Sequence, residues 1–365
     1  MFERRLYYHI DWALLIAVVA LCALGVVMIF STTSDPTRGT SHLYVTQLYA
    51  IALGLGAMLV TLTLDYRTLS DKSHLLYFAL CGLLVYVMFF GTAQMGARRW
   101  IQLGVVNLQP SEFAKAVLAL MLAKMLGEGR RPALTNNDLF IAAALTAVPF
   151  LIIARQPDLG TAVTLLPILL VVAYVAGMPM KYIYVGAVVA ILAAPIAYKF
   201  ALHDYQRERI STFLDPGSDP KGAGYQQIQA RITVGSGGMT GKGFMGGTQG
   251  QLRFLPVAHT DFIFSVLAEE QGLLGVLVAL GLYLFVIMRA LDAAKLAKDR
   301  LGAYLVLGVL ASFTFQVIYN ITMSAGLAPV KGLTLPLMSY GGSSMIATLA
   351  GFGLILNVRM RRFTN

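Results

Sequence analysis

The sequence predicts an all-α polytopic membrane protein with about ten transmembrane helices and a large extracytoplasmic loop between helices 7 and 8. Of its 365 residues, 57% are hydrophobic and only 13% are charged, whereas soluble domains carry about 25% charged residues. Apolar runs of about 20 residues, the length that crosses a bilayer as a helix, recur along the chain. We therefore expect residues 1–365 to form a single integral membrane domain.

The apolar runs give the positions of the expected spans. They lie at about 12–31, 43–64, 74–92, 111–127, 138–154, 160–177, 181–202, 262–288, 302–326 and 339–358. The first run is too long for the apolar region of a cleaved signal peptide and reads as the first span. Cys22 and Cys81 both fall inside spans, so we expect core thiols rather than a disulfide framework or a metal site.

The short loops predict the orientation, because cytoplasmic loops are enriched in Lys and Arg. With the N-terminus inside, fourteen basic residues lie on the inner side and five in the short outer loops. The inner set is Arg4, Arg5, Arg67, Lys72, Arg130, Arg131, Lys181, Arg289, Lys295, Lys298, Arg300, Arg359, Arg361 and Arg362; the outer set is Arg38, Arg98, Arg99, Arg155 and Lys331. Both termini are expected in the cytoplasm. The net charge of +10 mostly reflects this bias and does not indicate nucleic-acid binding.

The segment 203–260 is an unusually long polar loop for a membrane protein. It holds eleven of the 35 glycines, six Lys or Arg and four Asp or Glu. Long loops of this kind usually carry function. Residues Tyr225–Val234 and Gln206–Leu214 have helical patterns, so short helices on the outer membrane surface are expected there.

Asp261 is the first candidate for chemistry, because it stands where the chain re-enters the membrane after this loop. One interpretation is an N-cap for the following helix. The other is a general base, since a partly desolvated carboxylate has a raised proton affinity. The two interpretations are compatible. His259, two residues earlier, is more often a surface residue than a catalytic partner.

Glu112 and Lys115 are the second candidates. At spacing i, i+3 they share one face of a predicted helix and can pair. They form either a structural ion pair or part of an outward-facing cavity where Lys115 contacts a phosphate.

Other acidic residues are also candidates. Asp158, in a short outer turn, is expected at the outer end of the next helix, at the same depth in the membrane as Asp261. Glu269 and Glu270 lie about two turns inside a predicted span, and at least one should face a cavity or a partner.

Several motifs together resemble the SEDS family of bacterial cell-wall synthases. They are Arg98–Ile101, Leu108–Lys115, Arg155–Thr161, His203–Arg207, Asp219–Tyr225, Gly246–Gln249, Phe254–Pro256, His259–Phe264, Glu269–Gly272 and Pro336–Ser343. They run in order along most of the chain. His203–Arg207 and Gly247–Gln249 resemble the elongation-type members that serve cell shape rather than the division-type members.

The resemblance implies a peptidoglycan glycosyltransferase that polymerises lipid II, a polyprenyl-linked precursor, at the outer face of the bacterial cytoplasmic membrane. Asp261 matches the family's catalytic aspartate. On this expectation Lys115, Arg99 and Arg207 bind the pyrophosphate, Glu112 orients Lys115, and Asp158 helps bind a divalent ion or the sugar. Expected partners are a class B penicillin-binding protein and other elongation-complex proteins. Mg²⁺ or Mn²⁺ could screen the pyrophosphate, although no spacing shows a metal site, and no organic cofactor is expected.

Two alternatives from other classes remain at this point. A flippase for the same lipid-linked precursor would need a polar path across the membrane midplane, and Glu269 and Glu270 are the only good candidates for it. A non-enzymatic scaffold for the elongation machinery would need neither a polar path nor an outward carboxylate.

Overall fold

The computed structural model describes residues 9–35, 39–40, 42–94, 97–104, 106–128, 134–200, 204–219, 222–252 and 254–363. Some residues used in the sequence argument lie outside this part of the chain. They are Arg4, Arg5, Arg38, Arg130, Arg131, His203, Lys221 and Arg253.

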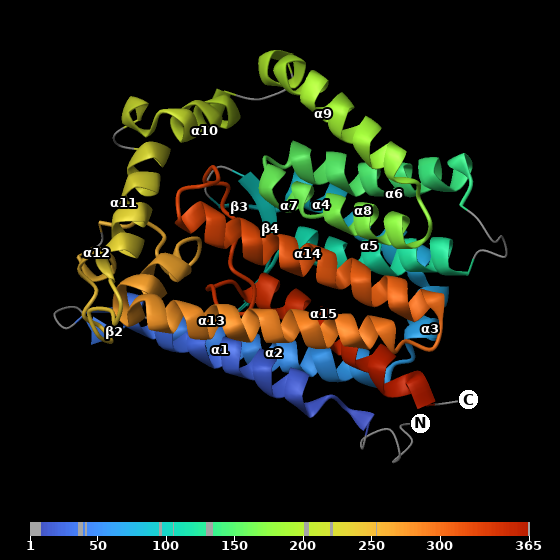
Figure 1. Cartoon of the computed structure of the whole chain (residues 1–365), viewed down its shortest axis with the longest axis horizontal. Helices are drawn as coiled ribbons and strands as arrows, with labels where there is room; N and C mark the ends of the chain where they lie inside the picture. Colours follow the sequence, from blue (N-terminus) through green and yellow to red (C-terminus); the bar gives the residue numbers. More distant parts are fainter. Residues whose placement is uncertain are drawn as a thin grey trace.

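All ten predicted apolar segments are helical, and most of them run along one common direction (Figure 1). The long helices are α1 (Trp12–Thr33), α2 (Leu43–Thr63), α4 (Ser73–Phe90), α5 (Pro110–Gly127), α6 (Asn136–Arg155), α9 (Met180–Phe200), α13 (Ile263–Lys295), α14 (Arg300–Ser324) and α15 (Gly342–Met360). The segment expected at 160–177 is broken into α7 (Leu159–Val163) and α8 (Leu166–Val175). The class predicted from composition, an all-α membrane protein, is confirmed.

Eight of the described helices are long and apolar enough to cross a membrane. The two predicted spans outside this set are α5, which carries several charges, and the broken pair α7–α8. The predicted count of ten therefore remains a prediction. The apolar helix α9 lies at the edge of the bundle with its side chains exposed (Figure 1). An apolar helix exposed all round is suited to contact with lipid.

The remaining elements are short. They are α3 (Tyr66–Asp71), α10 (Asp204–Leu214), η2 (Pro216–Ser218), α11 (Ala223–Ser236), α12 (Thr248–Gln251) and η3 (Arg361–Phe363), with strands β1 (Ser34–Asp35), β2 (Gly39–Thr40), β3 (Thr92–Gln94), β4 (Ala97–Leu103) and β5 (Val106–Leu108). Helices are present at both positions expected in the long loop, as α10 and α11, while their location on the membrane surface stays a prediction. The antiparallel ribbon β3–β4–β5, which carries Arg98 and Arg99, was not predicted.

One end of the bundle is held together by ion pairs. Asp11 precedes α1, caps it through Leu14 N–H and pairs with Arg289 of α13 and Arg359 of α15. Arg361 pairs with Asp65 at the same end, 3.0 Å apart. The beginning of α1 and the end of α15 therefore lie on one side of the bundle, while α10, α11 and α12 lie at the other (Figure 1).

Helices α2 and α15 pack closely because small residues stand at their interface. A Cβ at Gly353 would clash with the backbone of Met58 and the hydroxyl of Thr61. The same hydroxyl lies 3.0 Å from the carbonyl of Ala350. Buried Asn357 donates to the carbonyls of Thr61 and Leu62 at the end of α2. Small residues and interhelical hydrogen bonds are the usual means by which membrane helices associate.

The long helix α13 is interrupted at Gly272, whose φ of 63° and ψ of −164° are not helical. The glycine-rich loop pairs with the backbone that this break exposes. Lys242 N–H donates to the carbonyl of Glu269 at 3.0 Å, and Leu273 N–H donates to the carbonyl of Gly238 at 2.9 Å. A side chain at Gly241 would clash with the carbonyl of Glu270. The glycines are therefore required because the loop and the helix approach backbone to backbone.

Candidate active site

Asp261 lies in a turn just before α13, and three contacts hold this turn from neighbouring segments. Ser339 Oγ donates to the carbonyl of Thr260 at 2.5 Å, and Tyr340 N–H donates to the carbonyl of His259 at 2.9 Å. Asn320 Nδ2, from α14, donates to the backbone carbonyl of Asp261 itself at 2.8 Å. The backbone is fixed on both sides, so the position of the carboxylate is well defined.

The capping interpretation of Asp261 is wrong. Helix α13 starts at Ile263, and its N-cap is Phe262, which makes no side-chain capping bond. The carboxylate is instead partly exposed beside Gly332, where an added Cβ would lie 3.6 Å from its Oδ2. Burial raises the pKa of Asp261 to about 6, while a hydrogen bond from Thr260 and the charge of Arg209 lower it by less. This value suits a group that accepts a proton near neutral pH.

His259 makes a ring contact rather than a bond to Asp261. Its imidazole packs edge-on against Tyr340, with the ring centroids 5.6 Å apart. Burial lowers the pKa of His259, so the ring is neutral near pH 7. These contacts favour a packing role for this side chain.

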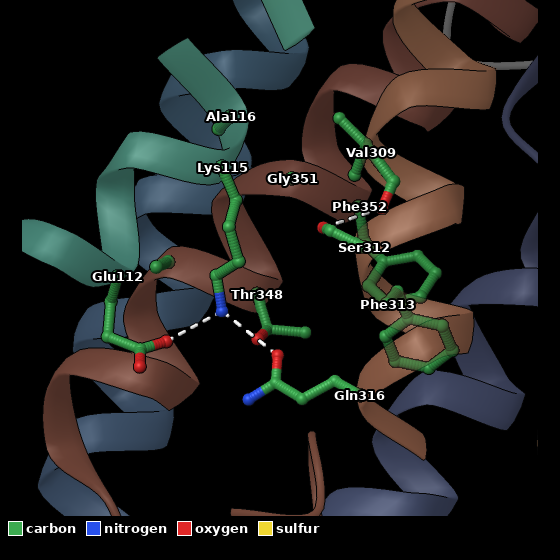
Figure 2. A pocket seen from close by; sticks show the side chains of 11 residues that line it. Glu112, Lys115, Ala116, Val309, Ser312, Phe313, Gln316, Thr348, Gly351 and Phe352 are labelled. Carbon is green, nitrogen blue, oxygen red and sulfur yellow. Dashed lines mark hydrogen bonds and ion pairs between the residues drawn. The ribbon is translucent and has the colours of Figure 1, made fainter. Parts of the chain in front are cut away.

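Glu112 and Lys115 form the predicted pair in the first two turns of α5. Lys115 Nζ lies 2.7 Å from Glu112 Oε2 and 3.0 Å from Gln316 Oε1 of α14, and both partners in the ion pair are buried. The three side chains line a pocket with Phe313, Thr348 and Phe352 (Figure 2). Within the described residues, hydrogen bonds use two of the three N–H donors of Lys115, so one is left for a ligand in this pocket.

Two amide side chains on α14 connect this pocket with Asp261. Gln316 Nε2 donates to the carbonyl of Thr334 at 3.3 Å. Asn320 Nδ2 donates to the carbonyl of Leu333 at 2.6 Å as well as to that of Asp261. Residues four apart face the same side of a helix. One face of α14 therefore holds Lys115, the 333–334 segment and the Asp261 turn in a fixed arrangement.

Asp158 occupies the turn between α6 and α7, where it caps α7 through Thr161 N–H at 3.2 Å. Its other oxygen accepts from Gln109 Nε2 at 2.9 Å and lies 3.8 Å from Arg99. Arg99 also donates to the carbonyls of Gln156 and Pro157. Burial raises the pKa of Asp158 and the charge of Arg99 opposes this effect. Both side chains are engaged in holding the turn.

This turn packs directly on the segment that flanks Asp261. A Cβ added at Gly160 would lie 2.9 Å from the carbonyl oxygen of Lys331. Only glycine allows this approach without displacing the 331–333 backbone. The predicted proximity of the Asp158 turn and the Asp261 region is therefore supported by a contact between their flanking segments.

Arg207 lies on α10, and its expected role as a pyrophosphate ligand stays a prediction. Its guanidinium donates to the carbonyl of Lys199, the penultimate residue of α9, at 2.9 Å. Arg209, also on α10, lies near enough for its positive charge to lower the pKa of both Asp261 and Lys331. Lys331 Nζ lies 5.8 Å from the centre of the Tyr319 ring. Arg209 is one of the six basic residues of the segment 203–260 and Lys331 one of the five in the short outer loops, but neither was predicted as a site residue.

Glu269 and Glu270 bind protein groups at the break in α13. Glu269 is fully buried and accepts from Lys242 Nζ at 2.7 Å and from the N–H groups of Thr248 and Gln249. Glu270 accepts from Ser31, near the C-terminal end of α1, at 2.5 Å. Because Asp11 and Arg289 meet at the opposite ends of the same two helices, Glu270 lies level with one end of α1 rather than with its middle.

Sequence reasoning also missed Gln316 and Asn320. A signal existed, because amide side chains within an apolar span are costly in lipid and usually face protein. In the part of the chain that the structure describes, no group of three or more His, Cys, Asp or Glu could hold a metal ion. Because Mg²⁺ is usually held by one or two carboxylates together with substrate phosphates, the expected Mg²⁺ or Mn²⁺ stays a prediction, and no step is assigned to it.

Comparison with known families identifies the class of protein that this fold and site define. The family model for the cell cycle proteins FtsW, RodA and SpoVE matches residues 12–363. The chain belongs to this family, the SEDS family that its motifs resemble.

Individual relatives cover nearly the whole chain. The peptidoglycan glycosyltransferase MrdB of Escherichia coli K12 is 41% identical over 97% of this chain and 94% of its own length. The probable peptidoglycan glycosyltransferase FtsW of Geobacter metallireducens is 38% identical over 96% of this chain and 95% of its own length.

Solved structures agree with the sequence relatives. The rod shape determining protein RodA of Thermus thermophilus has a TM-score of 0.73 and 34% identity, over 98% of both chains. A chain from a study of how a peptidoglycan synthase complex coordinates polymerization and crosslinking has a TM-score of 0.84 and 37% identity, over 98% of this chain and 99% of that one. The resemblance to the rod-shape member of the family is confirmed.

Proposed function

We propose that this chain is a peptidoglycan glycosyltransferase that polymerises lipid II into glycan strands during cell elongation. The observation that carries the proposal is Asp261, a carboxylate with a pKa of about 6 in a turn clamped by Asn320, Ser339 and Tyr340. Whole-length relatives with this named activity support the same conclusion.

The reaction is an inverting displacement at an anomeric carbon. The 4-hydroxyl of the acceptor GlcNAc attacks C1 of the donor MurNAc. The new bond joins that oxygen to C1, and the bond from C1 to the polyprenyl pyrophosphate breaks. Asp261 accepts the hydroxyl proton, and the pyrophosphate leaves with the bonding electron pair. This chemistry requires one base and electrostatic stabilisation of the leaving group.

The neighbouring clusters have supporting roles in this proposal. Lys115 offers its remaining N–H donor to a phosphate or sugar oxygen, while Glu112 and Gln316 fix its direction. Arg99 and Asp158 hold the 156–160 turn against the segment beside Asp261. The role first expected for Arg207 fits Arg209 better, because Arg209 acts on Asp261.

We also propose the finer placement of the protein. It resides in the bacterial cytoplasmic membrane with both termini in the cytoplasm, so that Asp261 faces outward. The beginning of α1 and the end of α15 lie on one side of the bundle, and basic residues are found there. Both observations support this orientation. We propose a class B penicillin-binding protein as partner, together with other elongation-complex proteins. A relative solved in a complex that couples polymerization to crosslinking supports this partner.

The flippase alternative loses the feature on which it rested. It required a polar path at the midplane through Glu269 and Glu270. Glu269 is instead bonded to the outer loop, and Glu270 meets the end of α1. The scaffold alternative gives no reason for a fixed carboxylate whose pKa is raised toward neutrality.

The direct test uses purified full-length protein with lipid II, alone and with its penicillin-binding partner. The proposal predicts that glycan strands form and that one polyprenyl pyrophosphate is released for each glycosidic bond made. Transfer of lipid II across vesicle bilayers without polymer would replace the glycosyltransferase with the flippase. If an active complex shows neither glycan polymer nor transfer of lipid II across the bilayer, that result would favour the scaffold alternative.

A further inference from the structure

The basic residues around Asp261 differ in whether protein groups already satisfy their charge. Lys115 is ion-paired with Glu112, and Arg99 is held by two carbonyls and Asp158. By contrast, within the described part of the chain no ion pair joins Arg209 or Lys331 to a carboxylate. These two side chains are therefore cations beside Asp261 whose charge is available to a ligand.

Arg209 and Lys331 come from distant parts of the sequence and meet beside Asp261. Arg209 belongs to α10, and Lys331 precedes Gly332, which lies against the Asp261 carboxylate. Burial, together with the charge of Arg209, lowers the pKa of Lys331, so the two cations are close enough to repel one another. The aromatic ring of Tyr319 lies beside the lysine, with Nζ 5.8 Å from the ring centre.

Two partly buried like charges are unfavourable unless an anion joins them. Asp261 supplies at most one negative charge, so the cluster keeps an excess of positive charge. We propose that Arg209 and Lys331 form an anion subsite that binds a phosphate group of the polyprenyl-linked substrate next to Asp261. The proposal rests on the proposed glycosyltransferase function for the identity of the substrate, but the subsite can be tested without turnover.

The chemistry of the two side chains fits a phosphate ester. A guanidinium offers paired donors that match two phosphate oxygens, and an ammonium adds a compact charge. A bulk anionic phospholipid would offer the same group at the membrane surface. The experiment must therefore separate the substrate from a general lipid headgroup.

The test measures binding of a short-chain polyprenyl pyrophosphate to the full-length protein in phosphatidylcholine nanodiscs. Lys331→Gln and Arg209→Gln should each weaken binding by about tenfold, the usual size of a charged hydrogen bond. Lys331→Arg should bind nearly as well as the wild type. Arg155→Gln removes an exposed outer-face cation at the end of α6 and serves as the matched control, with unchanged affinity expected.

Two further measurements show whether the bound phosphate belongs to the substrate or to a bulk lipid, and keep the proposal testable if a variant fails to fold. Phosphatidylglycerol should not compete with the pyrophosphate; competition at similar concentration overturns the substrate assignment. Wild-type affinity should fall as salt rises, and an affinity independent of salt overturns the subsite even if Lys331→Gln fails to insert. Unchanged binding by folded Lys331→Gln and Arg209→Gln proteins also overturns it. Pyrophosphate binding without any glycan polymer would retain the subsite and reject the glycosyltransferase.

Discussion

At the scale of single residues, the properties of Asp261 come from its surroundings rather than from its own chemistry. An ordinary aspartate is fully ionised at neutral pH and is a weak base. Here burial raises its pKa to about 6, and its backbone is bonded to α14 and to the 339–340 segment. The same residue in an open loop would lack both the proton affinity and the fixed position.

The raised pKa predicts how polymerisation depends on pH. A general base must be ionised, so the rate should be near its plateau above the folded-state pKa and should fall as pH drops through about 6. Arg209→Gln removes a positive charge that lowers this pKa, so it should move the acid limb to higher pH. The measurement is the initial rate of lipid II polymerisation against pH. An acid limb that stays in place in this variant would show that Arg209 does not act on Asp261.

The buried pair Glu112–Lys115 predicts a separation of stability from activity. Lys115→Met should lower the free energy of unfolding by about 3–5 kcal/mol, because it leaves the Glu112 charge buried without its partner. Adding Glu112→Gln removes that charge and should restore most of the stability, but not polymerisation. Thermal unfolding in detergent and the lipid II assay provide the two measurements. A stable double variant with normal polymerisation would leave the pair a purely structural role.

At the scale of elements, the main feature is the fit between α13 and the glycine-rich loop. The break at Gly272 exposes backbone groups, and the 238–243 segment forms hydrogen bonds with them. Glu269 also holds the loop by accepting hydrogen bonds from Lys242, Thr248 and Gln249. The loop thereby packs against the first part of α13, which directly follows the Asp261 turn.

Two glycines of this region give a matched pair of variants. Gly241 has a φ of 78° and no room for a Cβ, so Gly241→Ala should destabilise the protein by about 1–3 kcal/mol. Gly235, near the end of α11, has open space around its Cβ position, so Gly235→Ala should leave stability unchanged or slightly raised. Thermal unfolding and proteolysis of the loop would report both. Equal behaviour of the two variants would contradict the docked loop.

At the scale of the whole molecule, local patterns predicted the helices well and the long-range contacts poorly. The apolar runs gave every long helix, and the i, i+3 spacing gave the Glu112–Lys115 pair. The effect of Arg209 on Asp261 was not predicted, because neighbouring arginines on α10 look alike in sequence, and the role of Arg207 stays a prediction. Which of them acts on Asp261 depends on tertiary packing. The break at Gly272 was likewise invisible, because an isolated glycine is tolerated in a long helix.

Orientation of the whole chain gives a further prediction. If the basic residues set the topology, a reporter fused near Gly222 should lie outside the cytoplasmic membrane, and reporters after Arg300 and Asn365 should lie in the cytoplasm. Reporter activity and accessibility to a membrane-impermeant label provide the measurement. A cytoplasmic reporter near Gly222 would place Asp261 on the wrong side for an extracytoplasmic substrate.

The central claim is that Asp261 is the base, and one comparison tests it most directly. Asp261→Asn keeps the shape of the side chain and removes its ability to accept the proton. The structure gives this side chain no capping role, so the variant should fold and insert like the wild type. We expect lipid II polymerisation by the purified complex to fall by about 10²–10⁴-fold, the usual contribution of general-base catalysis, with substrate affinity little changed. Near wild-type amounts of glycan polymer from the folded variant would contradict the account.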